Sequence, residues 1–163
     1  MLIAVISDTH LPRGGRRLPD DCVERLSRAD LILHAGDFVA PEVLALIEAI
    51  GPPVAAVHGN VDSAELRHRL PEQRVVDAEG VRIGMVHDAG PAVGRLARMR
   101  DRFPGADAVV FGHSHIPLHE RGPDGFQIFN PGSPTDRRRQ PVHTMGLAAV
   151  GRGGLSFELV ELR

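Results

Sequence analysis

The sequence predicts an α/β fold in which two packed mixed β-sheets are flanked by helices. Strand and helix patterns alternate through the first two thirds of the chain, as they do in parallel sheets covered by helices. The last third alternates short strands with Gly-rich turns, which is typical of antiparallel hairpins. The chain has 163 residues, 42% of them hydrophobic, and shows no repeat or linker. We therefore expect a single domain over residues 1–163.

The first half of the chain predicts three buried strands and two helices. Asp20 or Asp21 is expected to cap a helix that runs to about residue 28. A second helix is expected over residues 41–50, because proline suits a first helical turn and Gly51 follows the apolar pattern. Short apolar runs indicate strands over residues 2–7, 31–35 and 54–57.

The second half predicts one tight hairpin, one helix and further strands. Strands over residues 74–78 and 81–86 are expected to join at Glu79-Gly80. Apolar residues at helical spacing predict a helix over residues 91–103. The remaining signals are an apolar strand over residues 108–111 and turns at 122–125 and 151–154.

Composition argues against several classes of protein. The net charge is −2 and the chain has no Trp or Tyr, so we do not expect a nucleic-acid surface. All 19 basic residues are Arg, which excludes mechanisms that need a lysine. No apolar run is long enough to span a bilayer, and no secretory signal is expected. With Cys22 as its one cysteine, the chain is expected in the cytoplasm.

Five of the predicted strands are followed by side chains that can bind a metal ion. Ligands of open α/β sheets bind outside the carboxyl ends of the strands, so these side chains are expected to meet at one edge. Where two of them are two residues apart, an extended chain would point both the same way. The set consists of Asp8, His10, Asp37, Asn60, His87, His113 and His115.

The chemistry of this set predicts two transition-metal ions. Imidazoles combined with carboxylates suit Mn, Fe, Ni, Zn or Co, whereas Ca and Mg prefer oxygen ligands alone. Seven ligands are too many for one tetrahedral ion and suit two ions that share a bridging carboxylate. Each fragment alone also has a structural explanation, such as a turn or a buried histidine. The combination at five strand ends favours the metal site.

These residues resemble the pattern of the calcineurin-like metallophosphoesterases, D-x-H, G-D, G-N-x-D, H and G-H-x-H. The chain is most similar to the small phosphodiesterase branch related to vacuolar sorting protein 29, a retromer subunit, because Pro117 and an N-P-G-S segment at 130–133 follow. The resemblance implies a four-layer αββα sandwich. It also implies one metal held by Asp8, His10, Asp37 and His115, and a second held by Asp37, Asn60, His87 and His113.

The resemblance further implies a metal-dependent phosphodiesterase that acts on a small phosphate ester. A hydroxide activated by two metals would attack phosphorus in line, with catalytic roles for Asp37, Asn60 and His87 and with manganese as the first expectation. Val61 stands where many family members have a proton-donating histidine, so the source of a general acid stays open. Asp88 after His87 also departs from the family pattern.

Other functions remain as alternatives at this point. Arg137, in the only dense basic run, and Ser133 are candidates for binding the substrate phosphate, although a solvated loop is the better explanation of the run. A non-catalytic protein-binding scaffold of the same fold is one alternative, and a phosphomonoesterase or nuclease of the superfamily is another. A homodimer is also considered, because relatives form dimers and a C-terminal strand could pair.

Overall fold

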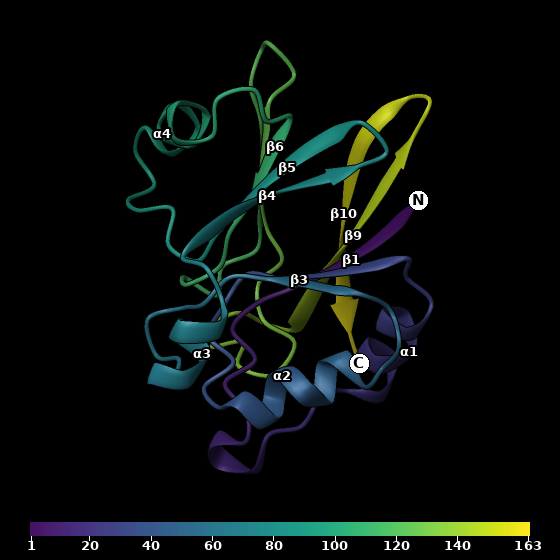
Figure 1. The fold of residues 1–163 in the computed structure, drawn as a ribbon, viewed down its shortest axis with the longest axis vertical. Helices are drawn as coiled ribbons and strands as arrows, with labels where there is room; N and C mark the ends of the chain where they lie inside the picture. Colours follow the sequence, from purple (N-terminus) through teal and green to yellow (C-terminus); the bar gives the residue numbers. More distant parts are fainter.

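The computed structural model describes residues 1–163, which form two five-stranded sheets packed face to face (Figure 1). The first sheet has the strand order β10-β9-β1-β2-β3 and the second has the order β4-β5-β6-β8-β7. The first contains β1 (Leu2–Ile6), β2 (Leu31–His34), β3 (Val54–Ala56), β9 (His143–Gly151) and β10 (Gly154–Leu162). The second contains β4 (Gln73–Ala78), β5 (Val81–Val86), β6 (Ala108–Val110), β7 (Leu118–Arg121) and β8 (Gln127–Asn130).

Helices cover both outer faces of the paired sheets. Figure 1 shows α1, α2 and α3 together on one side of the molecule and α4 on the opposite side. The first three pack on the first sheet and α4 packs on the second. They are α1 (Asp20–Ser27), α2 (Pro41–Glu48), α3 (Ala64–Arg69) and α4 (Arg95–Arg102), with a short 3₁₀ turn at Arg13–Gly15. This is the expected αββα arrangement.

Alternation along the central strands divides the core into three layers. In β1, Ile3 and Val5 pack between the two sheets, whereas Ala4 and Ile6 pack against the helices. The direction alternates because successive side chains of a strand point to opposite faces of the sheet. Both faces of β1 are therefore apolar, which explains why its sequence is a continuous hydrophobic run.

Parallel strands place their carboxyl ends along one edge. In the first sheet β1, β2 and β3 run parallel, and in the second β5, β6 and β8 run parallel. The loops after β1 and β2 stay paired beyond the strands, since the amide of Asp8 donates to the carbonyl of Gly36 at 2.9 Å. The amide of His10 donates likewise to the carbonyl of Asp37 at 3.0 Å. The loops after β1 and β2 are therefore held together at this edge.

The strand predictions are confirmed within one or two residues, but two details of the helix predictions are wrong and one helix was missed. Pro19 is the N-cap of α1. Asp20 and Asp21 lie in the first turn of the helix, where the positive end of the helix dipole stabilises carboxylates. The helix expected from residue 91 begins at Arg95, because Gly94 takes a left-handed conformation. Helix α3 was not predicted. None of the helices combines the length and the apolar character needed to cross a membrane.

Candidate metal centre

The structure brings together all seven side chains that the sequence singled out as metal ligands. Five of them are buried, and the other two lie on the solvent side of the group. The loops after β1, β2 and β3 supply Asp8, His10, Asp37 and Asn60, and the loops after β5 and β6 supply His87, His113 and His115. The centre therefore lies between the two sheets at their shared carboxyl edge.

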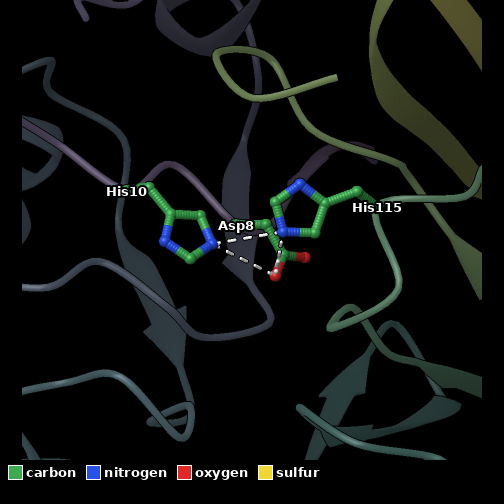
Figure 2. A group of neighbouring side chains, drawn as sticks. All are labelled: Asp8, His10 and His115. Atoms are coloured by element: carbon green, nitrogen blue, oxygen red, sulfur yellow. Dashed lines mark hydrogen bonds and ion pairs between the residues drawn. The ribbon is translucent and has the colours of Figure 1, made fainter. Parts of the chain in front are cut away.

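The first group consists of Asp8, His10 and His115 (Figure 2). Figure 2 shows the two imidazoles and the carboxylate pointing toward one another. The Nε2 atoms of the two histidines are 3.2 Å apart, and Asp8 Oδ1 lies 3.4 Å from His115 Nε2 and 3.8 Å from His10 Nε2. Two ring nitrogens with facing lone pairs would repel each other, so this arrangement suits a shared proton or a cation.

The second group consists of Asp37, Asn60, His87 and His113. Asn60 Oδ1 is 3.1 Å from His87 Nε2 and 3.0 Å from His113 Nδ1. Asp37 Oδ2 is 3.3 Å from His87 Nε2. The group thus contains two imidazoles, one amide oxygen and one carboxylate, which is a mixed donor set of the kind that transition metals accept.

Asp37 joins the two groups. Its Oδ2 atom lies 3.5 Å from His10 Nε2 in the first group and 3.3 Å from His87 Nε2 in the second. Asp8 Oδ1 is fully buried and accepts no hydrogen bond. A buried carboxylate oxygen without a donor is costly unless a cation neutralises it. The residues present therefore fit divalent ions on both sides of Asp37.

Backbone carbonyls set the orientation of two of the histidines. His87 Nδ1 lies 2.7 Å from the carbonyl of Ala35, and His115 Nδ1 contacts the carbonyl of Asp136. Because a carbonyl can only accept, each Nδ1 is assigned as the protonated nitrogen. The Nε2 atom of each ring then faces the centre, as expected for histidines that bind a metal through Nε2.

The buried charges of the centre alter two pKa values in opposite directions. Burial alone would raise the pKa of Asp37, but the hydrogen bond and charge of His87 lower it to about 2. Burial alone would lower the pKa of His87, but the hydrogen bond that its ring donates to Asp37 and the charges of Asp8 and Asp37 raise it to about 9. For His115, burial outweighs the attraction of Asp8 and lowers the pKa. The metal-free centre therefore holds an ion pair between His87 and Asp37.

Three glycines allow the loops to approach one another closely. A methyl group at Gly59 would overlap the Oδ1 of Asp37, and one at Gly112 would overlap the hydroxyl of Ser7. A methyl group at Gly36 would come within 2.8 Å of His87 Nδ1. Each of these glycines directly precedes a candidate ligand, and these contacts explain why no larger residue fits there.

The expected extended geometry of the two-residue spacings is wrong. Asp8, His10, His113 and His115 all have positive φ angles, between 45° and 68°, and Asp37 has a φ of 63°. These residues lie in tight left-handed turns, which carry local strain for side chains other than glycine. The paired side chains still meet at the centre because both loops turn sharply inward after their strands.

Asp62 braces the centre and was missing from the predicted site. Its carboxylate accepts the amide N–H groups of Gly59, Asp37 and Val39 at 2.7, 3.0 and 2.7 Å. The residue belongs to the Gly-Asn-x-Asp motif, so its spacing from Asn60 was the available signal. Asp62 links the loop after β3 to the loop after β2, although it does not face the centre.

His34 is a buried support between two of the loops. Its Nδ1 accepts the amide of Gly36 at 3.1 Å, so the opposite nitrogen carries the proton that faces Thr9 Oγ1 at 3.2 Å. The ring stacks on Phe38 with centroids 3.5 Å apart. Burial lowers the pKa of His34 to about 3, which keeps the ring neutral.

The two predicted substrate contacts lie in different environments. Ser133 is buried, donates to the carbonyl of Asp8 at 2.7 Å and accepts the amides of Thr135 and Asp136. Arg137 is exposed, and its guanidinium contacts the carbonyl of Gln140. Ser133 therefore supports the Asp8 loop, and a substrate contact by either residue stays a prediction.

A cavity of about 240 Å³ opens beside the second group of ligands. Asn60, His87 and Asp88 line this cavity. The Asp88 carboxylate accepts the amide of Gly90 at 2.7 Å, so this departure from the family pattern forms a local turn and leaves His87 in place. The other lining residues are His58, Gly59, Arg67, Glu72, Val86 and Arg102.

Comparison with known proteins identifies the family. The calcineurin-like phosphoesterase superfamily domain matches residues 1–153. A probable metallophosphoesterase of Methanothermobacter thermautotrophicus is 36% identical over 156 residues, which cover 93% of this chain and 87% of the relative. A probable metallophosphoesterase of Methanocaldococcus jannaschii is 36% identical over 138 residues, covering 83% of this chain and 69% of that protein.

Solved structures agree in fold over nearly the whole chain. A Thermotoga maritima protein superposes with a TM-score of 0.77 at 30% identity, covering 99% of each chain. Vps29 of Entamoeba histolytica, solved in complex with zinc, gives a TM-score of 0.78 at 23% identity, covering 100% of both chains. A novel archaeal phosphodiesterase gives 0.77 at 20% identity, covering 99% and 100%. With a matching family domain, the metallophosphoesterase relatives and this shared fold, the chain belongs to the calcineurin-like phosphoesterase superfamily.

Proposed function

We propose that the protein is a metal-dependent phosphodiesterase with a two-metal centre. Asp8, His10, Asp37 and His115 would hold one divalent ion, and Asp37, Asn60, His87 and His113 would hold the other. The observation that carries the proposal is the position of Asp37 Oδ2, between His10 Nε2 at 3.5 Å and His87 Nε2 at 3.3 Å. The Oδ1 atom of Asp8, which accepts no hydrogen bond, supports a cation in the group formed with His10 and His115.

The residues of the chain would hold and orient these groups. When bound, two divalent ions supply Lewis acidity toward the phosphate oxygens and lower the pKa of water. The carbonyl of Ala35 fixes the ring of His87, and Asn60 directs its amide oxygen toward the rings of His87 and His113. Imidazoles together with carboxylates favour Mn, Fe, Ni, Zn or Co over Mg and Ca. Manganese is our first choice for reconstitution.

A diester suits the surroundings of the centre better than a monoester. The cavity of about 240 Å³ beside Asn60 and His87 offers room for a second ester group. Val61 offers no proton to a leaving group, so esters with acidic leaving groups should react fastest. The fold is also that of a protein described as an archaeal phosphodiesterase.

Reconstitution with metals tests the proposal. Purified protein would be stripped with chelator, loaded with Mn²⁺, Fe²⁺, Ni²⁺, Zn²⁺ or Co²⁺, and assayed on bis-p-nitrophenyl phosphate, p-nitrophenyl phosphate and a cyclic nucleotide. We expect metal-dependent turnover that is fastest on the diester, and its loss in Asp37→Asn. Asp124→Asn is the matched control, because Asp124 lies in an exposed turn, where it pairs with Arg100 and accepts the amide of Phe126, and it contacts none of the candidate ligands.

The same experiment separates the enzyme from a protein-binding scaffold of the same fold. A protein that binds no metal and hydrolyses none of the three substrates would favour the scaffold. Full turnover in Asp37→Asn would refute the two-metal scheme, although the protein would still be a phosphoesterase. A homodimer and a cytoplasmic location also belong to the proposal. Strand β10 forms a free edge of the first sheet, and size-exclusion chromatography with light scattering tests the dimer.

A further inference from the structure

A second cavity, of about 380 Å³, lies beside the loop that carries His113 and His115. Ser114, between these two histidines, forms part of its wall. The other lining residues are Ile116, Arg138, Arg139 and Gln140. The cavity therefore adjoins the loop that supplies one candidate ligand to each group, whereas Asn60 and His87 themselves line the other cavity.

The charge of this cavity differs from that of the cavity beside Asn60 and His87. Its lining includes two guanidinium groups and no carboxylate, whereas Glu72 and Asp88 line the other cavity. Arg138 has a single ion-pair partner, Asp136, at 3.5 Å, and Asp136 is shared with Arg16 at 3.3 Å. No carboxylate of the protein pairs with the guanidinium of Arg139. The positive charge on this wall is therefore incompletely neutralised.

Ser114 adds a hydrogen-bond donor to the same wall. Its hydroxyl oxygen accepts the amide of Ile116 at 3.2 Å and the side-chain amide of Asn130 at 3.2 Å. Both contacts use the oxygen as an acceptor, so the hydroxyl proton is left for a further partner. The cavity thus offers one O–H and two guanidinium groups, all of which are donors.

The loop that carries the arginines is fixed to the centre at several points. Ser133 donates to the carbonyl of Asp8, and Thr135 donates to the carbonyl of Thr9. The carbonyl of Asp136 contacts the ring of His115. These bonds join the start of the loop to two of the candidate ligands, so the cationic wall keeps a defined position relative to the centre.

We propose that this cavity binds a second anionic group of the substrate, with Arg138, Arg139 and Ser114 as specificity-determining residues. The inference rests on the proposed function, because it assumes that the scissile phosphate lies at the ligand centre. The substrate class is then a phosphate ester that carries a further carboxylate or phosphate. Planar guanidinium groups bind either anion through paired charge-assisted hydrogen bonds.

Matched diesters test this specificity in the Mn²⁺-loaded protein. Two p-nitrophenyl phosphodiesters would be compared, one with a 2-carboxyethyl and one with a neutral 2-carbamoylethyl second ester. We expect kcat/KM to be about tenfold higher for the carboxylate, through a lower KM. One charge-assisted hydrogen bond contributes enough binding free energy for about a tenfold change in affinity. A 2-phosphonoethyl diester distinguishes phosphate from carboxylate as the preferred group.

The double variant Arg138→Ala/Arg139→Ala should abolish this preference. Its kcat/KM ratio should fall close to one, while its rate on the carbamoyl diester stays within about twofold of the parent. Arg152→Ala is the matched control, because Arg152 is an exposed arginine in the turn between β9 and β10. If the parent protein hydrolyses both diesters with a kcat/KM ratio near one, the inference is overturned. The proposed phosphodiesterase activity would still hold.

Phosphate binding to the metal-free protein gives a readout that does not need turnover. In ¹H–¹⁵N spectra, inorganic phosphate should shift the amides of Ser114, Arg139 and Gln140 saturably, and the double variant should bind at least about fivefold more weakly. If phosphate does not move the resonances of these three amides, the inference is overturned, whatever the kinetic result. If neither diester is hydrolysed, the proposed function fails, and this titration still decides whether the cavity binds anions.

Discussion

Raising the pH should strengthen metal binding at the second group of ligands. In the metal-free protein the pKa of His87 is about 9, so near neutral pH its Nε2 carries a proton toward Asp37. A metal ion must displace this proton. At pH 7.5 the competition should cost about 2 kcal/mol, or about 30-fold in affinity, from the distance between pH and pKa. The dissociation constant should therefore fall about tenfold per pH unit up to pH 9.

Calorimetry measures both the affinity and the displaced proton. Mn²⁺ would be titrated into chelator-treated protein between pH 7 and 8.5, in pairs of buffers with different ionisation enthalpies. We expect about one proton to be released for each ion bound at the second group. In His87→Asn, which keeps an oxygen ligand but has no titrating ring, the pH dependence should be shallower.

The stability of the metal-free protein should change with pH in the opposite direction. The folded-state pKa of His87 lies above the unfolded value of 6.5. Its contribution to stability is therefore complete below pH 6.5 and is lost as the pH rises through about 9. The metal-loaded protein should instead gain stability over this range. A dissociation constant for Mn²⁺ that is unchanged between pH 7 and 8.5 would refute the ion pair on which this reasoning depends.

Four further predictions concern three residues that hold the loops of the centre and one buried cysteine in α1. Gly59→Ala should destabilise the protein by about 1–3 kcal/mol in urea unfolding, because its methyl would overlap Asp37. Asp62→Ala should cost about 3 kcal/mol and weaken Mn²⁺ binding, because three amides lose a charged acceptor. His34 has a pKa of about 3, so its contribution to stability is present above pH 6.5 and is lost as the pH falls. The free energy of unfolding of His34→Gln should therefore decrease less steeply with falling pH than that of the parent protein. Cys22, whose pKa burial raises to about 12, should resist alkylation at pH 8 until the protein unfolds.

Matched controls make these predictions specific. Gly153→Ala adds a methyl that would contact nothing, so its unfolding midpoint should match the parent. Asp101→Ala removes an exposed carboxylate in α4 that accepts no side-chain or amide hydrogen bond, and should keep full Mn²⁺ affinity. Equal effects of Gly59→Ala and Gly153→Ala would contradict the close packing of the loops. Rapid alkylation of Cys22 in the folded protein would contradict its burial.

The sequence predicted the sheets better than the helices for a physical reason. Strands such as β1 and β2 are buried on both faces, so their apolar runs are continuous and their bounds are visible. Helix α3 has six residues, of which only Leu66 is buried, and therefore shows no apolar periodicity. Its signal was the cap, since Ser63 accepts the amide of Leu66 at 3.3 Å.

The composition of the centre was predictable, but its internal geometry was not. Residue type and position after a strand were enough to indicate which side chains meet, because parallel strands end at a common edge. Spacing alone suggested that Asp8 and His10 leave an extended chain, whereas both have left-handed backbones. Backbone conformation in such turns depends on tertiary contacts, which a sequence pattern with period two does not contain.

Left-handed ligand residues explain why bracing residues lie within the same motifs as the ligands. A side chain other than glycine in this conformation costs on the order of 1 kcal/mol, and the surrounding structure must offset that strain. At Asp37 the offset comes from Asp62, which accepts its amide, and at His113 it comes from the Oδ2 of Asp8, 3.0 Å from the His113 amide. Asp8 therefore binds a backbone amide through one oxygen and leaves the other, unpartnered, for a cation. Metal affinity should then depend on Asp62 as well as on the ligands, although Asp62 belongs to neither group of candidate ligands.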